Sequence, residues 1–348
     1  MSHIFYTGAI LKQKTIDFLR KNLPLSIKHK IPRFIIDTIA GTAAGPSSKQ
    51  AVADVHPENA KVITTLEELD IELKKLDRAA QVSDDALRKQ FQTFSMAFHL
   101  DNPQDPWSKA YRDKQFELYR HISGKPYDIA NEVSIFNVEE ASNVPFPYYT
   151  KSCLTVGNHL ISIGFMIKMM DLKSNSNILE FGPGWGNTTE ILGRMGHKVT
   201  AVDIEQNFID LIKLRAEKNG LNIRTVHDDF AYIETIDKPV DAVLFFECFH
   251  HCSDHLKLIR SFDKAVAEDG IVVFAAEPIT DMFPIPWGLR MDGESLWAIR
   301  KNGWLELGFT ETYFTETMER YGWNLSKHVC NETPWGTIFI ARKNKTMY

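Results

Sequence analysis

Residues 178–189 read Ile-Leu-Glu-Phe-Gly-Pro-Gly-Trp-Gly-Asn-Thr-Thr, an apolar strand followed by a glycine-rich turn and the start of a helix. Its glycines are Gly182, Gly184 and Gly186. Because glycine tolerates left-handed backbone and has no side chain, such a turn lets a ligand approach the main chain closely. The free N–H groups of the following helix then offer the ligand polar partners. We therefore expect a nucleotide-like cofactor at this turn.

A second short apolar strand, residues 198–203, ends on an acid. This acid is Asp203, 19 positions after Gly184. In a βαβ unit an acid at this place accepts hydrogen bonds from ribose hydroxyls. The spacing G-x-G-x-G differs from the dinucleotide pattern G-x-G-x-x-G, and Glu180 stands where a pyrophosphate would meet a carboxylate. The turn thus favours a zwitterionic ligand with an amino group and a sulfonium over a dinucleotide. A glycine turn that binds nothing is the other alternative.

The run Glu180 to Gly186 resembles the first motif of class I S-adenosylmethionine (SAM) dependent methyltransferases, and the resemblance covers roughly residues 145–343. It implies that Asp229, rather than Asp228, bonds the adenine amino group and that neighbouring side chains sandwich the ring. It also implies that Tyr148 or Tyr149 contacts the methionine carboxylate. The expected SAM site therefore comprises Glu180, Gly182, Gly184, Gly186, Asp203, Asp229, Phe230 and Tyr149.

The same resemblance implies an α/β fold, a Rossmann-like sheet of seven strands whose last strand is antiparallel and lies between the fifth and sixth. Apolar runs supply the strands. Those after the first two are expected near residues 222–228, 240–247, 270–277, 323–329 and 337–341. The run at 240–247 is almost continuously apolar, as in a parallel strand buried on both faces.

Residues 1–125 form an expected helical extension ahead of a methyltransferase domain at 126–348. Thr65 and Glu68 have the spacing of a capping box before a helix with a leucine stripe. We expect a second helix from Ser83 that continues through Phe98, and a third from about residue 106 to 122. The extension is predicted to be a cap on the sheet domain, with a homodimerisation arm as the alternative.

Composition favours a cytoplasmic enzyme. The chain is 44% hydrophobic and 24% charged with a formal net charge of -5, and no stretch is expected to approach the roughly 18 apolar residues that cross a bilayer. The acidic balance argues against a nucleic-acid partner. The four cysteines form no C-x-x-C pair, so we expect reduced thiols.

Residues 12–33 carry seven Lys or Arg against one Asp, interleaved with apolar residues. A basic amphipathic segment of this kind can lie on an anionic membrane surface. Three interpretations of this segment are open: a solvated face, which we favour, peripheral contact with the inner face of a membrane, and contact with nucleic acid.

Candidate catalytic residues follow the fourth strand. Residues 246–255 read Phe-Glu-Cys-Phe-His-His-Cys-Ser-Asp-His, at the end of a central strand where open α/β sheets bind their ligands. Histidine suits a general base at neutral pH. We expect His251, or its neighbour His250, to be that base, with Glu247 or Asp254 orienting it. The alternative is a histidine that only packs.

The same stretch is a weak metal-binding candidate. A structural zinc site needs a second pair of ligands well apart in sequence, and none is present. A catalytic divalent cation held by Glu247, a histidine and Glu277 is an alternative that the sequence does not favour.

The expected acceptor wall consists of Glu277, Trp287, Arg290 and Asp292. An aromatic face with carboxylates and a guanidinium suits a sugar ring and its hydroxyls. Residues 287–297, together with residues 105–112, Asn131-Glu132 and residues 145–148, resemble bacterial methyltransferases of surface-polysaccharide assembly. That resemblance implies O-methylation of a sugar hydroxyl on a glycan or glycan precursor. The alternatives are an O- or N-methyltransferase of a small metabolite and a non-catalytic SAM-binding module in a glycan-synthesis complex.

Overall fold

The structure is a computed structural model of the chain, and it describes residues 60–98, 101–132, 136–143 and 152–344. All of these residues belong to one compact unit. The basic segment 12–33 and Tyr149 lie outside the described residues. The expectations of membrane contact, a homodimer and a cytoplasmic location therefore stay predictions.

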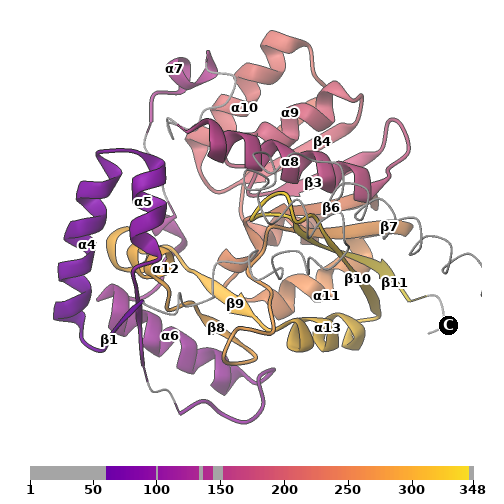
Figure 1. Cartoon of the computed structure of the whole chain (residues 1–348). Coiled ribbons are helices and arrows are strands. Elements are labelled where there is room, and N and C mark those ends of the chain that lie inside the picture. The colour runs from indigo at the N-terminus through magenta and orange to yellow at the C-terminus, as the bar shows by residue number, and fades with distance from the viewer. Residues whose placement is uncertain (1–59, 99–100, 133–135, 144–151, 345–348) are drawn as a thin grey trace, which may run out of the picture. The chain divides into compact units, whose positions relative to one another are not determined.

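A seven-stranded sheet forms the centre of the described residues (Figure 1). Its strand order is β10-β11-β7-β6-β3-β4-β5, and β11 runs antiparallel to both of its neighbours. The other pairs are parallel. The strands are β3 (Asn177–Phe181), β4 (Lys198–Asp203), β5 (Ile223–His227), β6 (Val240–Phe246), β7 (Val266–Ala275), β10 (Trp323–Val329) and β11 (Thr337–Lys343). This order confirms the expected class I methyltransferase sheet, including the antiparallel strand between the fifth and sixth.

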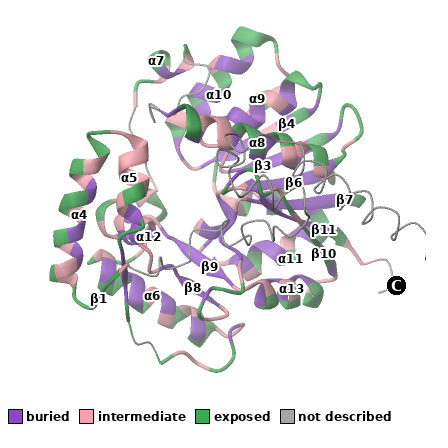
Figure 2. Ribbon diagram, viewed as in Figure 1, coloured by how far each residue is buried: buried purple, intermediate pink, exposed green. Residues whose placement is uncertain are grey.

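The central strands are buried on both faces, which explains their continuous apolar sequences. Residues 242–245 of β6 are fully buried, whereas the edge strand β5 is at most half-buried (Figure 2). Helices cover the two faces. The flanking helices are α8 (Cys153–Met170), α9 (Asn187–Arg194), α10 (Gln206–Asn219), α11 (His255–Ala265) and α13 (Glu311–Arg320).

Alternate residues of the central strands enter two separate cores. Leu179, Phe245 and Phe274 belong to the core that also contains residues of α11 and α13. Ile178 and Leu244 belong to the other core, which contains residues of α8 and α9. Because successive side chains of a strand point to opposite faces, this division fixes the register of these strands.

Helix α8 is 18 residues long with a mean hydropathy of 1.3, so it is long and apolar enough to cross a membrane by length and composition alone. The expectation that no stretch approaches this length was wrong. Met166 and Met170 of this helix are buried in the core against the sheet. This packing is that of a helix covering a sheet.

The described part of the amino-terminal extension contains three long helices and two short strands. They are α4 (Leu66–Ala80), α5 (Asp84–Phe91), α6 (Lys109–Ser123), β1 (Lys61–Ile63) and β2 (Phe94–Met96). The Thr65 hydroxyl accepts a hydrogen bond from Glu68 N–H, as the capping-box spacing predicts. The second helix ends at Phe91 instead of continuing through Phe98. Residues 94–96 pair with β1 in parallel, so strand pairing overrides the helical spacing of the phenylalanines.

An insertion after β7 packs against this extension, although more than 150 residues separate them in the chain (Figure 1). Tyr111 on α6 donates a hydrogen bond to the carbonyl of Trp287, and the Trp287 indole donates to the carbonyl of Pro106. Arg300 pairs with Asp70 on α4. The insertion contains β8 (Trp287–Leu289), α12 (Gly293–Trp297), η4 (Ala298–Asn302) and β9 (Leu307–Phe309).

Smaller elements complete the described chain. These are η1 (Ile129–Asn131), α7 (Val138–Ser142), η2 (Phe230–Thr235) and η3 (Phe249–His251). Helix α7 is held to α10 through Arg215, whose guanidinium donates to the carbonyl of Ala141.

Trp287→Phe should destabilise the protein by about 1–3 kcal/mol, because the carbonyl of Pro106 loses its donor and the smaller ring leaves a void. Urea denaturation measures the change. The control Phe98→Leu, at a side chain that is 40% exposed, should cost under about 0.5 kcal/mol. Equal stabilities for the two variants would contradict a structural role for Trp287.

Candidate active site

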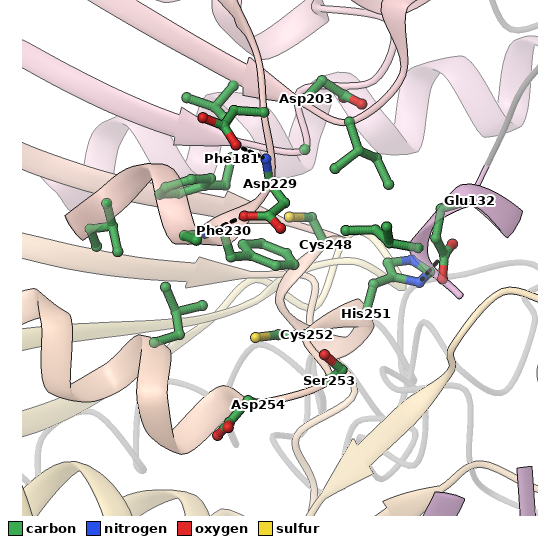
Figure 3. A pocket seen from close by; sticks show the side chains of 18 of the residues that line it. Glu132, Phe181, Asp203, Asp229, Phe230, Cys248, His251, Cys252, Ser253 and Asp254 are labelled. Carbon is green, nitrogen blue, oxygen red and sulfur yellow. Dashed lines mark hydrogen bonds and ion pairs between the residues drawn. The ribbon is translucent and has the colours of Figure 1, made fainter. Parts of the chain in front are cut away.

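A cavity of about 380 Å³ opens at the carboxyl ends of β3, β4, β5 and β6 (Figure 3). Residues from the ends of these four strands and the loops after them line it, together with residues of α11 and with Tyr127, Ile129, Glu132 and Trp304. Open α/β sheets place their ligands at this edge, and the volume lies in the range of small-molecule sites. The cavity is the candidate active site.

The three glycines of the first turn all have left-handed backbone, with φ of 56°, 50° and 76° in chain order. A Cβ on Gly182 would lie 2.5 Å from Cys248 Sγ, and one on Gly186 would lie 2.5 Å from an Ile212 side-chain carbon. A Cβ on Gly184 would meet nothing within 4 Å. Gly182 and Gly186 therefore allow neighbouring side chains to pack closely against the turn. Gly184 leaves its own backbone open to the cavity. Gly182 also lines this cavity.

Asp203 lies at the end of β4, lines the cavity and is tied to both adjoining loops. Its carboxylate accepts hydrogen bonds from the N–H of Gly184 at 3.1 Å and from the N–H of Glu205 at 2.9 Å. Burial raises the pKa of Asp203 to about 6, and the two N–H donors oppose that rise. The second strand thus places an acid beside the glycine turn, as the sequence predicts.

Asp229 and Phe230 follow β5 and also line the cavity. The Asp229 carboxylate caps η2 by accepting the N–H of Ala231 at 2.6 Å. The Phe230 ring packs 5.6 Å from the ring of Phe181. Figure 3 shows both side chains at the wall of the pocket that Asp203 borders, with Asp228 also among the lining residues.

Glu180 lies beneath the glycine turn and is not part of the described lining. Its carboxylate accepts a hydrogen bond from the Thr189 hydroxyl at 2.7 Å, and the side chain is 1% exposed. Burial raises the pKa of Glu180 to about 7. Glu180 therefore joins β3 to α9. Tyr149, the remaining residue of the expected SAM site, lies outside the described residues.

Glu277 anchors the loop after β6. Its carboxylate accepts the N–H groups of Cys248, Phe249 and His250 at 2.8, 2.9 and 3.2 Å, and it lies 2.7 Å from His250 Nδ1. The side chain is buried. The carboxylate is thus committed to the loop and does not lie among the described residues that line the cavity.

His250 and His251 are adjacent on η3, but they face different surroundings. Burial alone would lower the pKa of the buried His250, and the carboxylates of Glu277 and Glu306 overcome this and raise it. His251 lines the cavity, with a ring 4.2 Å from that of His250. Burial and the neighbouring His250 lower its pKa well below the usual range. His251 is therefore the neutral imidazole of the pair.

Glu132 lies beside His251, and both residues line the cavity (Figure 3). Its Oε2 lies 3.7 Å from His251 Nδ1, and its Oε1 accepts the N–H of Leu305. Burial raises the pKa of Glu132 to about 8. The sequence predicted no catalytic role for Glu132 or Glu306. Glu132 is one of the residues that carry the resemblance to enzymes of surface-polysaccharide assembly, whereas Glu306 belongs to no recognisable motif. Tertiary packing brings both to the histidines.

The other predicted residues are dispersed. Glu247 has a left-handed backbone with φ of 51° and lines the cavity, and its carboxylate lies 3.7 Å from His159 Nε2. Arg290 is buried and pairs with Asp292 and Glu306. The Asp292 side chain caps α12. Neither these two residues nor Trp287 is part of the described cavity lining.

Residues 179–274 match the protein family described as "Methyltransferase domain". Ubiquinone biosynthesis O-methyltransferase of Actinobacillus pleuropneumoniae serotype 5b is 29% identical over 103 residues, which are 28% of this chain and 44% of that protein. An uncharacterised methyltransferase of Oceanobacillus iheyensis is 30% identical over 104 residues, 29% of this chain and 47% of that protein. The chain thus spans less than half the length of these curated relatives.

Among solved structures, Burkholderia thailandensis 1,6-didemethyltoxoflavin-N1-methyltransferase, with bound 1,6-didemethyltoxoflavin and S-adenosylhomocysteine, is 17% identical with a TM-score of 0.41. That alignment covers 61% of this chain and 92% of that chain. The family match, the strand order and the glycine turn define a class I SAM-dependent methyltransferase domain, and SAM is the cofactor of this class.

Asp203→Asn should weaken SAM binding by about 1.5–3 kcal/mol, because a charged acceptor for the ribose hydroxyls is lost. In the wild type, SAM affinity should rise about tenfold between pH 5 and pH 7, since the carboxylate ionises through its raised pKa of about 6. Isothermal titration calorimetry measures both effects. The variant should lack this pH dependence.

Asp210→Asn on the exposed side of α10 is the matched control for Asp203 and should bind SAM as the wild type does. If Asp203→Asn kept full affinity at pH 7, the assignment of Asp203 to the ribose would be wrong.

Glu277→Gln should lower the free energy of unfolding by about 1–3 kcal/mol, because the amide NH₂ meets backbone donors that the carboxylate now accepts. Chemical denaturation of this variant can be compared with that of Glu67→Gln, an exposed control on α4. A loss no larger than that of the control would show that the loop after β6 holds its form without Glu277.

Proposed function

We propose that the protein is a SAM-dependent O-methyltransferase that methylates a hydroxyl group of a glycan or glycan precursor. The observation that carries this proposal is a single cavity bordered by the glycine turn and Asp203 and also by His251 and Glu132. One part suits a nucleoside with a charged amino acid, and the other offers groups that accept a proton. Both parts are needed for methyl transfer to a hydroxyl.

In this reaction the acceptor oxygen attacks the SAM methyl carbon in line with the sulfur. The C–S bond breaks with its electron pair left on sulfur, so the sulfonium becomes the neutral thioether of S-adenosylhomocysteine. An O–CH₃ bond forms, and the hydroxyl proton passes to the neutral imidazole of His251. Positioning and proton removal are what the protein supplies.

Oxygen-bearing side chains around the same cavity support a polyhydroxylated acceptor. Glu132, Glu247, Ser253 and Asp254 all line it. Carboxylate and hydroxyl oxygens accept hydrogen bonds from sugar hydroxyls, so several of them together suit a ring with several hydroxyls. The sequence resemblance to enzymes of surface-polysaccharide assembly favours the same class of acceptor.

A small metabolite with a hydroxyl group is the second candidate acceptor. The relative named ubiquinone biosynthesis O-methyltransferase favours it, through 29% identity over 103 residues. The matching segment is 28% of this chain. The similarity therefore supports the SAM domain more than it supports a particular acceptor.

His251→Ala should lower turnover by roughly 10² to 10⁴-fold while SAM affinity stays unchanged, because the proton acceptor is removed and the ribose and adenine contacts remain. The assay follows a labelled methyl group from SAM into glycan, lipid-linked and small-molecule fractions of cell extract. His121→Ala, at an exposed histidine on α6, is the control and should keep full turnover.

Label in the glycan or lipid-linked fraction would support the proposed acceptor, and label only among small molecules would replace it with the metabolite. SAM binding without transfer to any fraction would contradict the enzyme and favour a non-catalytic SAM-binding module.

A further inference from the structure

Three side chains converge behind the cavity wall in a pattern that the sequence did not predict. One ligand-type atom each from His250, His251 and Glu306 lies within 4.8 Å of the other two. The histidines are on η3, whereas Glu306 directly precedes β9 in the insertion. Two imidazoles and one carboxylate are a ligand set that binds zinc in catalytic sites.

The spacing of this cluster suits atoms that share a cation. His250 Nε2 lies 3.5 Å from Glu306 Oε2, which is longer than an ordinary hydrogen bond. Two ligands of a tetrahedral zinc ion lie about 3.4 Å apart, given bonds of about 2.1 Å. His251 Nδ1 is buried and makes no hydrogen bond within the described residues.

The surroundings orient these side chains as outer partners orient metal ligands. Glu277 lies 2.7 Å from His250 Nδ1, which leaves the Nε2 of that ring directed at Glu306. The backbone N–H of Leu305 donates to Glu132 Oε1 and leaves Oε2 for the His251 side.

Three carboxyl groups surround the two imidazoles. Glu277 and Glu306 are buried, and the Glu132 side chain is 10% exposed. Arg290 contacts Glu306 and also pairs with Asp292. Carboxylate oxygens that lie beside imidazole nitrogens are suited to bind a divalent cation.

We propose that His250, His251 and Glu306 bind one divalent cation of the zinc type, with an open coordination position toward the cavity beside Glu132. The alternative metal-ligand set from the sequence, Glu247 with a histidine and Glu277, does not come together in the structure. Glu277 is committed to the loop after β6, and Glu247 lies near His159.

This inference deepens the proposed function and rests on it for its role in turnover. A cation here makes a hydroxyl held against it more acidic. His251 would then act as a ligand in place of the proton acceptor, and the proton of the more acidic hydroxyl would leave to water in the cavity.

Full-length protein, stripped with EDTA, should bind one Zn²⁺ per chain by isothermal titration calorimetry. The Co²⁺ form should show the absorption of a tetrahedral site. Glu306→Gln should weaken Zn²⁺ binding at least about tenfold, because even loss of an outer partner has such an effect. His251→Gln, at a partly exposed ring, is the second variant and should weaken binding likewise. Cys153→Ser, at an exposed thiol, is the control and should bind Zn²⁺ as the wild type does.

A wild type without Zn²⁺ affinity, or two variants that both bind like it, would overturn the metal site. Methyl transfer is measured in parallel. Full transfer by stripped protein that has no Zn²⁺ affinity would refute the metal site and leave the proposed function standing. Zn²⁺ binding that depends on Glu306, without any acceptor methylated, would support the metal site and refute the proposed function.

Discussion

The acceptor side of the site depends on the buried carboxylate of Glu277. Parallel strands end with backbone N–H groups that no neighbouring strand accepts, and the loop after β6 directs three of them at this one side chain. Glu247 and Ala276, at the ends of adjacent strands, both have left-handed backbone, which costs residues with a Cβ about 1–3 kcal/mol each. The hydrogen bonds of Glu277 offset that cost and hold His250 and His251 at the cavity.

The two parts of the site have different origins in the chain. The cofactor part comes from the turn after β3, the end of β4 and the loop after β5, all within about 50 consecutive residues. The acceptor part combines Glu132, the loop after β6 and residues 304–306, which together span more than 170 residues of the chain. A SAM-binding frame of one kind can therefore serve different acceptors, because the segments that meet the acceptor lie outside it.

The acceptor part depends on contacts between the amino-terminal extension, the insertion after β7 and Glu132, which follows the extension in the chain. Tyr111 and Trp287 join the extension to the insertion, and Leu305 N–H of the insertion donates a hydrogen bond to Glu132 beside His251. The extension is thus tied to the sheet domain through the insertion, within one compact unit. The predicted domain boundary at residue 125 separates two segments of the sequence. In the folded chain, residues on both sides of this boundary pack against each other.

Local sequence patterns alone predicted the sheet, the glycine turn and the acid at the end of β4. These features depend on residues that are close in the chain, where alternation, glycine spacing and capping leave a direct pattern. The sequence also predicted that His251 would lie at the end of the fourth strand, which β6 and η3 confirm.

Only the tertiary structure decided that residues 94–96 form a strand, because β1 supplies the hydrogen bonds that override their helical spacing. It also decided that Trp287 is buried away from the cavity and that Glu132 and Glu306 meet the histidines. Such contacts between distant segments arise from packing and leave no periodic signal in the chain.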